Sequence, residues 1–104
     1  MKFRIANILT MAGLFLIQLS SAQEKDSYLS GKVWFEAMEY DSALYYMNLE
    51  LEKSSPREEA LFYRGISYLM LNQEDKAIED LLKTPFQLRS ESYFWLAKAY
   101  ARKG

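Results

Sequence analysis

From about residue 26 onward, hydrophobic side chains recur every three or four positions, which is the spacing of one face of an α-helix. The clearest segment is 57–71, where Leu61, Gly65 and Tyr68 stand at positions i, i+4 and i+7. Strict alternation of hydrophobic and polar residues, the pattern of a half-buried strand, is missing. The pattern therefore predicts an all-α chain with helices over residues 26–38, 41–53, 57–71, 74–83 and 87–103.

Capping and helix-breaking residues separate these segments. Ser55 and Glu58 have the spacing of a capping box, and Pro56 suits the first position of a helix. Asn72 suits the left-handed residue that ends a helix, and Pro85 stops the helix before it. We therefore expect the third helix to begin near residue 57, with Ser55 as its cap.

The segment 1–22 has the features of a cleavable secretory signal. Lys2 and Arg4 precede an apolar stretch over 5–19, and small residues lead up to Ala22, after which we predict cleavage. The alternative, a retained membrane anchor, is disfavoured because a spanning helix needs roughly 20 mostly apolar residues. A lipid anchor is excluded because there is no cysteine. We expect an exported protein, periplasmic or secreted, with a helical domain over residues 23–104 and no membrane contact after cleavage.

The amino-acid composition limits the kinds of active site that the chain could form. Half of the 104 residues are hydrophobic, which is enough for a packed core. Cysteine and histidine are both absent, so the chain lacks thiol chemistry and the commonest general base. The adjacent carboxylates Glu58-Glu59 and Glu79-Asp80 are interpreted as solvated surface. We expect no enzyme, cofactor or metal site, and the net charge of −1 gives no basis for nucleic-acid binding.

Three small or aromatic landmarks recur at one period. The step from Gly31 to Gly65 equals the step from Ala43 to Ala77, and Trp34 is followed by Tyr68 at the same spacing. This common spacing matches the period of the tetratricopeptide repeat (TPR), a helix–turn–helix unit, and the chain resembles that family. A third, partial match is carried by Tyr93, Leu96, Ala97 and Tyr100.

The resemblance implies antiparallel helix pairs stacked as a short right-handed TPR solenoid of about two and a half repeats, over 24–55, 56–85 and 86–104. Two positions depart from the family pattern: Met38 replaces the turn glycine, and Glu50 replaces a small residue. The spacing from the second repeat to the third is two residues shorter than the spacing from the first to the second, and the third repeat reaches its turn residue at Gly104. The small landmarks and the aromatic positions Trp34, Tyr68 and Tyr100 are all expected in the core, where helices cross.

In the TPR family, the first helices of successive repeats line a concave groove that holds a peptide or a partner helix. The resemblance implies a groove with an apolar middle and charged flanks, which would bind another protein or peptide. Phe62→Asp is then expected to leave the fold intact and to weaken partner binding. The implied groove residues are Tyr28, Lys32, Phe35, Glu36, Phe62, Ile66, Leu69, Met70, Phe94, Lys98 and Arg102.

Three alternatives stay open. The apolar groove residues could pack against neighbouring helices rather than bind a partner. The aromatic helix over 87–103 could cap the fold, dock onto another molecule or self-associate. The chain could also be the front part of a longer repeat protein, such as the exported input region of a sensor.

Overall fold

The computed structural model describes residues 26–104, so the predicted signal segment 1–22 lies outside the described residues. The described part of the chain is helical and holds no strand, which confirms the all-α prediction. Each of the expected helices is present, with ends that differ from the expected ones by a few positions. They are α2 (Ser27–Glu36), α3 (Tyr40–Leu51), α4 (Ala60–Met70), α5 (Glu74–Leu82) and α6 (Arg89–Lys103), with the short 3-10 helix η1 (Phe86–Leu88) before α6.

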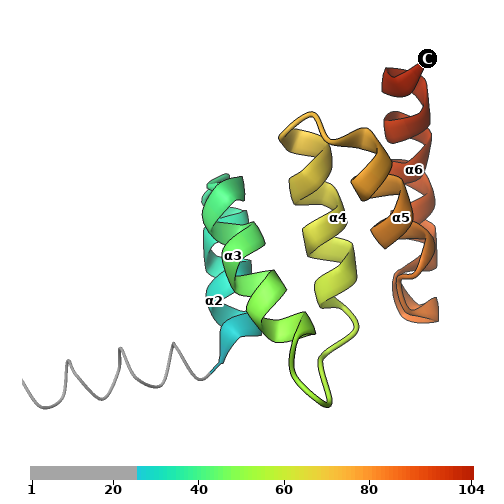
Figure 1. The fold of residues 1–104 in the computed structure, drawn as a ribbon. Coiled ribbons are helices and arrows are strands. Elements are labelled where there is room, and N and C mark those ends of the chain that lie inside the picture. The colour runs from blue at the N-terminus through green and yellow to red at the C-terminus, as the bar shows by residue number, and fades with distance from the viewer. Residues whose placement is uncertain (1–25) are drawn as a thin grey trace, which may run out of the picture.

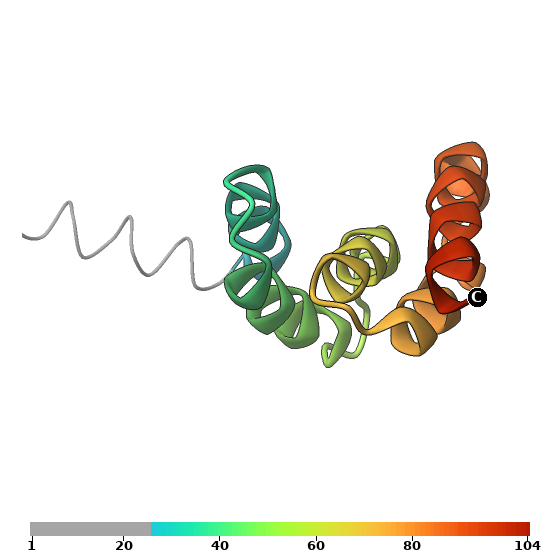
Figure 2. The same ribbon diagram turned by 90° about the horizontal axis from the view of Figure 1, so that it is seen from above.

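The helices stand side by side in the order of the chain (Figure 1). Each helix packs against the next, and α4 also contacts both α2 and α6. The middle helix α4 therefore has the α2–α3 pair on one side and the α5–α6 pair on the other (Figure 1). Seen from above, the row follows a curve (Figure 2). Among the described residues, α4 is therefore the helix that contacts both α2 and α6, the first helices of the neighbouring pairs.

The turns within the helix pairs share one backbone feature. Met38 and Asn72 are the non-glycine residues with positive φ in the described part of the chain, at 61° and 63°, and Gly104 has a φ of 82°. The step from Met38 to Asn72 equals the repeat spacing of the sequence, and the step from Asn72 to Gly104 is two positions shorter, as expected for the third repeat. The predicted left-handed role of Asn72 is therefore confirmed, and Met38 occupies the conformation that glycine tolerates best.

The predicted capping box at the start of α4 is wrong. The helix begins at Ala60, and its N-cap residue Glu59 makes no side-chain cap hydrogen bond. The physical reason lies in Glu50, whose buried carboxylate accepts a 2.8 Å hydrogen bond from the backbone N–H of Arg57 and a 2.7 Å one from Nζ of Lys53. Glu50 thus holds the loop before α4 in a non-helical path.

The two glycines in helices mark close helix crossings, as expected. A Cβ added at Gly31 would lie 2.7 Å from Cε of Met47, and one added at Gly65 would lie 2.8 Å from Cγ of Leu81. Both distances are below a normal van der Waals contact, so each second helix approaches its first helix closely. Ala43 and Ala77 are fully buried at these crossings.

Several landmarks predicted as core lie at the surface. Trp34, Ala97 and Tyr100 are exposed, whereas Tyr68 is half-buried against the main core. Ala97 and Tyr100 are exposed because no helix of the described residues covers that side of α6. Their assignment to the core from the sequence is therefore wrong. The repeat register that places them is still consistent with the spacing of the left-handed turn residues.

Candidate interaction surface on α6

The side of α6 that faces the preceding helices repeats the corresponding side of α4. The shorter repeat spacing aligns Ala60 with Ser92 and Ser67 with Ala99, and all of these side chains are buried. At the same offset Tyr63 aligns with Trp95, and both are partly buried against the core. The two helices therefore pack on the helix before them in the same way.

The opposite side of the two helices differs. In α4, Phe62, Ile66 and Leu69 are buried in the main core beside Leu81 and Leu96. In α6, the residues at the equivalent repeat positions are exposed. We call this exposed side the outer face of α6; it comprises Tyr93, Phe94, Ala97, Lys98, Tyr100 and Ala101.

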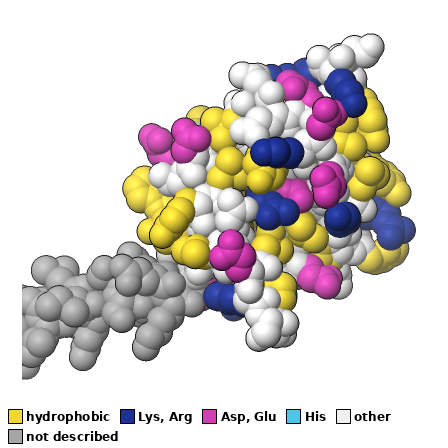
Figure 3. All heavy atoms as spheres, viewed as in Figure 1, with side chains coloured by type: hydrophobic (Ala, Val, Ile, Leu, Met, Phe, Trp, Pro, Cys, Tyr) yellow, Lys and Arg dark blue, Asp and Glu magenta, His cyan; other side chains and the backbone are white. Residues whose placement is uncertain are grey.

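The outer face is largely aromatic. Tyr93, Phe94 and Tyr100 are 60%, 57% and 53% exposed. The Nζ atom of Lys98 lies 4.7 Å from the centroid of the Phe94 ring and 5.1 Å from that of Trp95. Figure 3 shows hydrophobic side chains gathered with Lys and Arg along the edge of the molecule where α6 lies. Such a contiguous apolar surface with a cationic group is typical of interaction sites.

The middle of the groove predicted from the sequence is closed. Ile66 and Leu69 belong to the core, and Phe62 is 7% exposed. The prediction that these residues form an accessible apolar floor is therefore wrong, because α5 and α6 pack over them. Of the α4 members, Met70 is the exposed one.

Arg102 also has a different role from the predicted one. Its Nη1 donates a 3.0 Å hydrogen bond to the carbonyl oxygen of Leu69, and its Nη2 donates to the side chain of Asn72. The same guanidinium lies 3.5 Å from a carboxylate oxygen of Glu74. Arg102 therefore fixes the end of α6 to the α4–α5 turn and does not line an open groove.

The α2 members of the predicted set form an aromatic cluster with α4. The ring of Tyr63 lies 6.0 Å from that of Tyr28 and 5.1 Å from that of Phe35. Lys32 lies over the Tyr28 and Tyr63 rings, 5.7 and 5.6 Å from their centroids, whereas Glu36 is exposed. Burial is the main cause that raises the pKa of Tyr28 to about 12, and the neighbouring Tyr63 adds to the effect. The Tyr28 phenol therefore stays protonated, and the side chain contributes to packing.

The two acids of the Glu79-Asp80 pair have separate environments, which corrects their joint interpretation as solvated surface. Asp80 is 4% exposed and accepts hydrogen bonds of 2.7 and 2.8 Å from Arg64. Arg64 also donates a 3.0 Å hydrogen bond to Asn48. This network ties α3, α4 and α5 together, whereas Glu79 is exposed and faces Lys83 at 3.5 Å.

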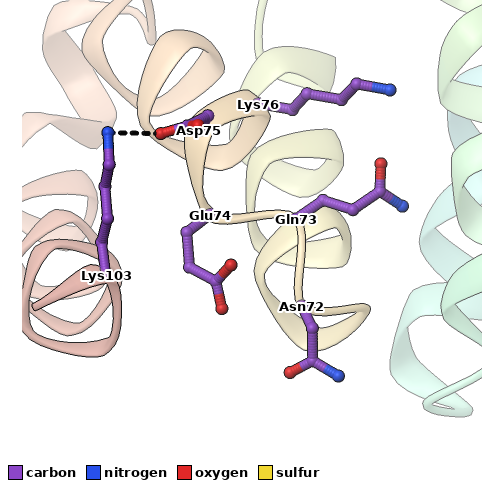
Figure 4. A pocket seen from close by; sticks show the side chains of 6 residues that line it. All are labelled: Asn72, Gln73, Glu74, Asp75, Lys76 and Lys103. Carbon is purple, nitrogen blue, oxygen red and sulfur yellow. Dashed lines mark ion pairs between the residues drawn. The ribbon is translucent and has the colours of Figure 1, made fainter.

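A polar hollow of about 260 Å³ lies beside the α4–α5 turn (Figure 4). Lys103 reaches across from α6 to form a 2.6 Å ion pair with Asp75 there. Among the described residues no cluster of three acidic side chains could hold a metal ion. The residues that line the hollow are Asn72, Gln73, Glu74, Asp75, Lys76 and Lys103.

No protein-family model, curated protein or solved structure matches this chain. Within residues 26–104, no helix is both long and apolar enough to span a membrane.

Proposed function

We propose that this chain is an exported protein-interaction module of the tetratricopeptide type and that its partner binds the outer face of α6. Support for the TPR assignment comes from the paired helices, the crossings at Gly31 and Gly65, and the left-handed turn residues at repeat spacing. The export part of the proposal rests on the sequence of residues 1–22 alone.

One observation carries the choice of surface. Three aromatic side chains of α6 are more than half exposed on a side where the equivalent residues of α4 are buried or partly buried. Full burial of one large apolar side chain stabilises a complex by about 1.5–3 kcal/mol before the costs of association. Aromatic residues are also the commonest anchors of protein interfaces, so this face offers more binding energy than the charged flanks of the α2 cluster.

A photo-crosslinking experiment in the producing cells tests this proposal. A photoreactive phenylalanine analogue replaces Tyr100 in one strain and Tyr45, an equally exposed tyrosine of α3, in the control strain. We expect a discrete protein adduct at position 100 and none at position 45. Equal adducts at both positions, or none at position 100, would remove α6 as the partner surface.

The export part has a separate measurement. N-terminal sequencing of the protein from the envelope or medium should begin at Gln23. A chain that retains Met1 in the cytoplasm would contradict export without affecting the assignment of the binding surface.

A further inference from the structure

We infer that the outer face of α6 binds an amphipathic α-helix of another polypeptide. This helix carries an alanine followed one helical turn later by leucine or methionine, and a carboxylate within reach of Lys98. The inference rests on the proposed function, because it names the class of partner for the same surface. It follows from two helices of this chain that already cover equivalent faces.

The first precedent is α5 on α4. A Cβ added at Gly65 would lie 2.8 Å from Cγ of Leu81 and 3.3 Å from the carbonyl oxygen of Ala77. Ala77 and Leu81 are both buried and are one helical turn apart. The covering helix therefore brings its backbone close at the alanine and fills the remaining space with the leucine.

The second precedent is α3 on α2. Met47 lies over Gly31, with its Cε 2.7 Å from the position of an added Cβ, and Ala43 is fully buried one turn earlier. The same arrangement of alanine and a long apolar side chain thus occurs twice in this molecule. Ala97 is the third position of the series. It carries the Cβ that Gly31 and Gly65 lack, so a covering helix would lie slightly farther from α6 than α3 and α5 lie from their partners.

Lys98 sets the charge of the partner. The equivalent residue of α4 is Ile66, which is buried beneath its neighbours. A helix placed over α6 would bring apolar surface against the Lys98 ammonium unless it supplies a carboxylate, since an unpaired buried charge is costly. An acidic helix satisfies this requirement, and the long lysine side chain can reach its carboxylate along the Phe94 ring.

The chain contains a suitable probe, the segment 73–84, which holds Ala77, Leu81 and two pairs of acidic residues. A dye-labelled peptide of this segment is titrated into the full chain and followed by fluorescence anisotropy. We expect saturable binding, weakened at least about tenfold by Ala97→Arg in the protein or by Ala77→Arg in the peptide. Ser54→Arg adds the same charge at an exposed position in the loop after α3, away from the outer face, and should leave the affinity unchanged.

A second measurement covers the case of a peptide too short to stay helical in solution. The segment 73–84 is appended directly after Gly104, whose left-handed backbone corresponds to Asn72 before α5. We expect the melting temperature to rise by about 5 °C or more. Ala97→Arg should remove the rise and Ser54→Arg should retain it.

The outcomes separate this inference from the proposed function. No binding and no rise in melting temperature would overturn the helix inference, while crosslinks at position 100 would still support a partner on α6. Sedimentation of the unextended chain covers the other occupant. A dimer that Ala97→Arg converts to monomer would assign the face to a second copy and would also overturn the inference.

Discussion

The comparison of α4 with α6 shows how strongly neighbours decide the role of a side chain. The two helices carry similar small and aromatic residues at several equivalent repeat positions, and both bury the side that faces the preceding helix. They differ on the other side, where Phe62 is 7% exposed and Phe94 is 57% exposed. The same residue type at the same repeat position is therefore a core residue in one helix and surface in the other.

The first helix, α2, differs from α4 on the side where a preceding helix would lie. Its Leu29 and Val33 are exposed, whereas their equivalents in the next repeat, Tyr63 and Ser67, are partly or fully buried. The side of α2 that faces α3 and α4 is covered, and Gly31 is buried there. Within residues 26–104, the row therefore has two end faces that no other helix covers. They differ in composition: α2 exposes aliphatic side chains, and α6 exposes aromatic side chains and a lysine.

The largest effect expected from this comparison is the contrast between Phe62→Asp and Phe94→Asp. Phe62→Asp places a charge in the core, so we expect the free energy of unfolding to fall by about 4 kcal/mol or more. This reverses the expectation drawn from the sequence that the fold would tolerate the change. Phe94→Asp should change the free energy of unfolding by less than about 0.5 kcal/mol. Urea denaturation of both variants measures the difference, and similar midpoints would contradict the equivalence of the two positions.

The adjacent acids of α5 provide the second contrast. Asp80→Ala leaves the mostly buried Arg64 guanidinium without its carboxylate, and we expect a loss of about 3 kcal/mol in the free energy of unfolding. Glu79→Ala removes only an exposed ion pair and should cost less than about 0.5 kcal/mol. Thermal melts of the two variants provide the test. Equal melting temperatures would show that Asp80 is as dispensable as a surface acid.

The third contrast is between the two glycines at the helix crossings of the first and second repeats. Gly65→Ala forces a Cβ against a branch carbon of Leu81 and the backbone oxygen of Ala77, so we expect a net loss of about 1–2 kcal/mol. Gly31→Ala meets the flexible end of Met47, which can move, and the gain in helix propensity should bring the net change near zero. Chemical denaturation that ranks Gly31→Ala as the more damaging change would contradict this account.

The smallest expected effect concerns Glu50 and pH. Burial alone raises the pKa of Glu50, but the hydrogen bonds from Lys53 and the Arg57 backbone outweigh it and lower the pKa below its usual 4.5. Because the folded-state pKa is depressed, the stabilisation is complete above the unfolded-state value and is lost as pH falls through the folded-state value. We expect Glu50→Gln to cost about 1 kcal/mol at pH 7.

The pH profile supplies the control for this prediction. The difference in the free energy of unfolding between the native chain and Glu50→Gln should shrink as the pH drops below 4.5. A difference that stays constant from pH 7 to pH 3 would mean that the Glu50 charge does not hold the loop.

Local patterns predicted the helices well because spacing, small residues and breakers act over a few positions. The turn at Asn72 and the crossings at Gly31 and Gly65 were predicted for this reason. The role of Arg102 could not be predicted, because its partners Leu69 and Asn72 lie in an earlier helix and turn, far back along the chain. The predicted capping box at Ser55 failed for a different reason: Glu50, at the end of α3, accepts a hydrogen bond from the backbone N–H of Arg57, a role that helix-capping patterns do not describe.

The sequence by itself determined that the chain forms paired helices, where each pair turns, and which residues are small enough for close crossings. These properties follow from backbone preferences and from the helical period of about 3.6 residues. Only the tertiary structure decided which apolar residues are core and which are surface, as Phe62 and Phe94 show. The physical reason is that burial depends on whether a neighbouring helix covers a face, and a phenylalanine alone does not carry that information.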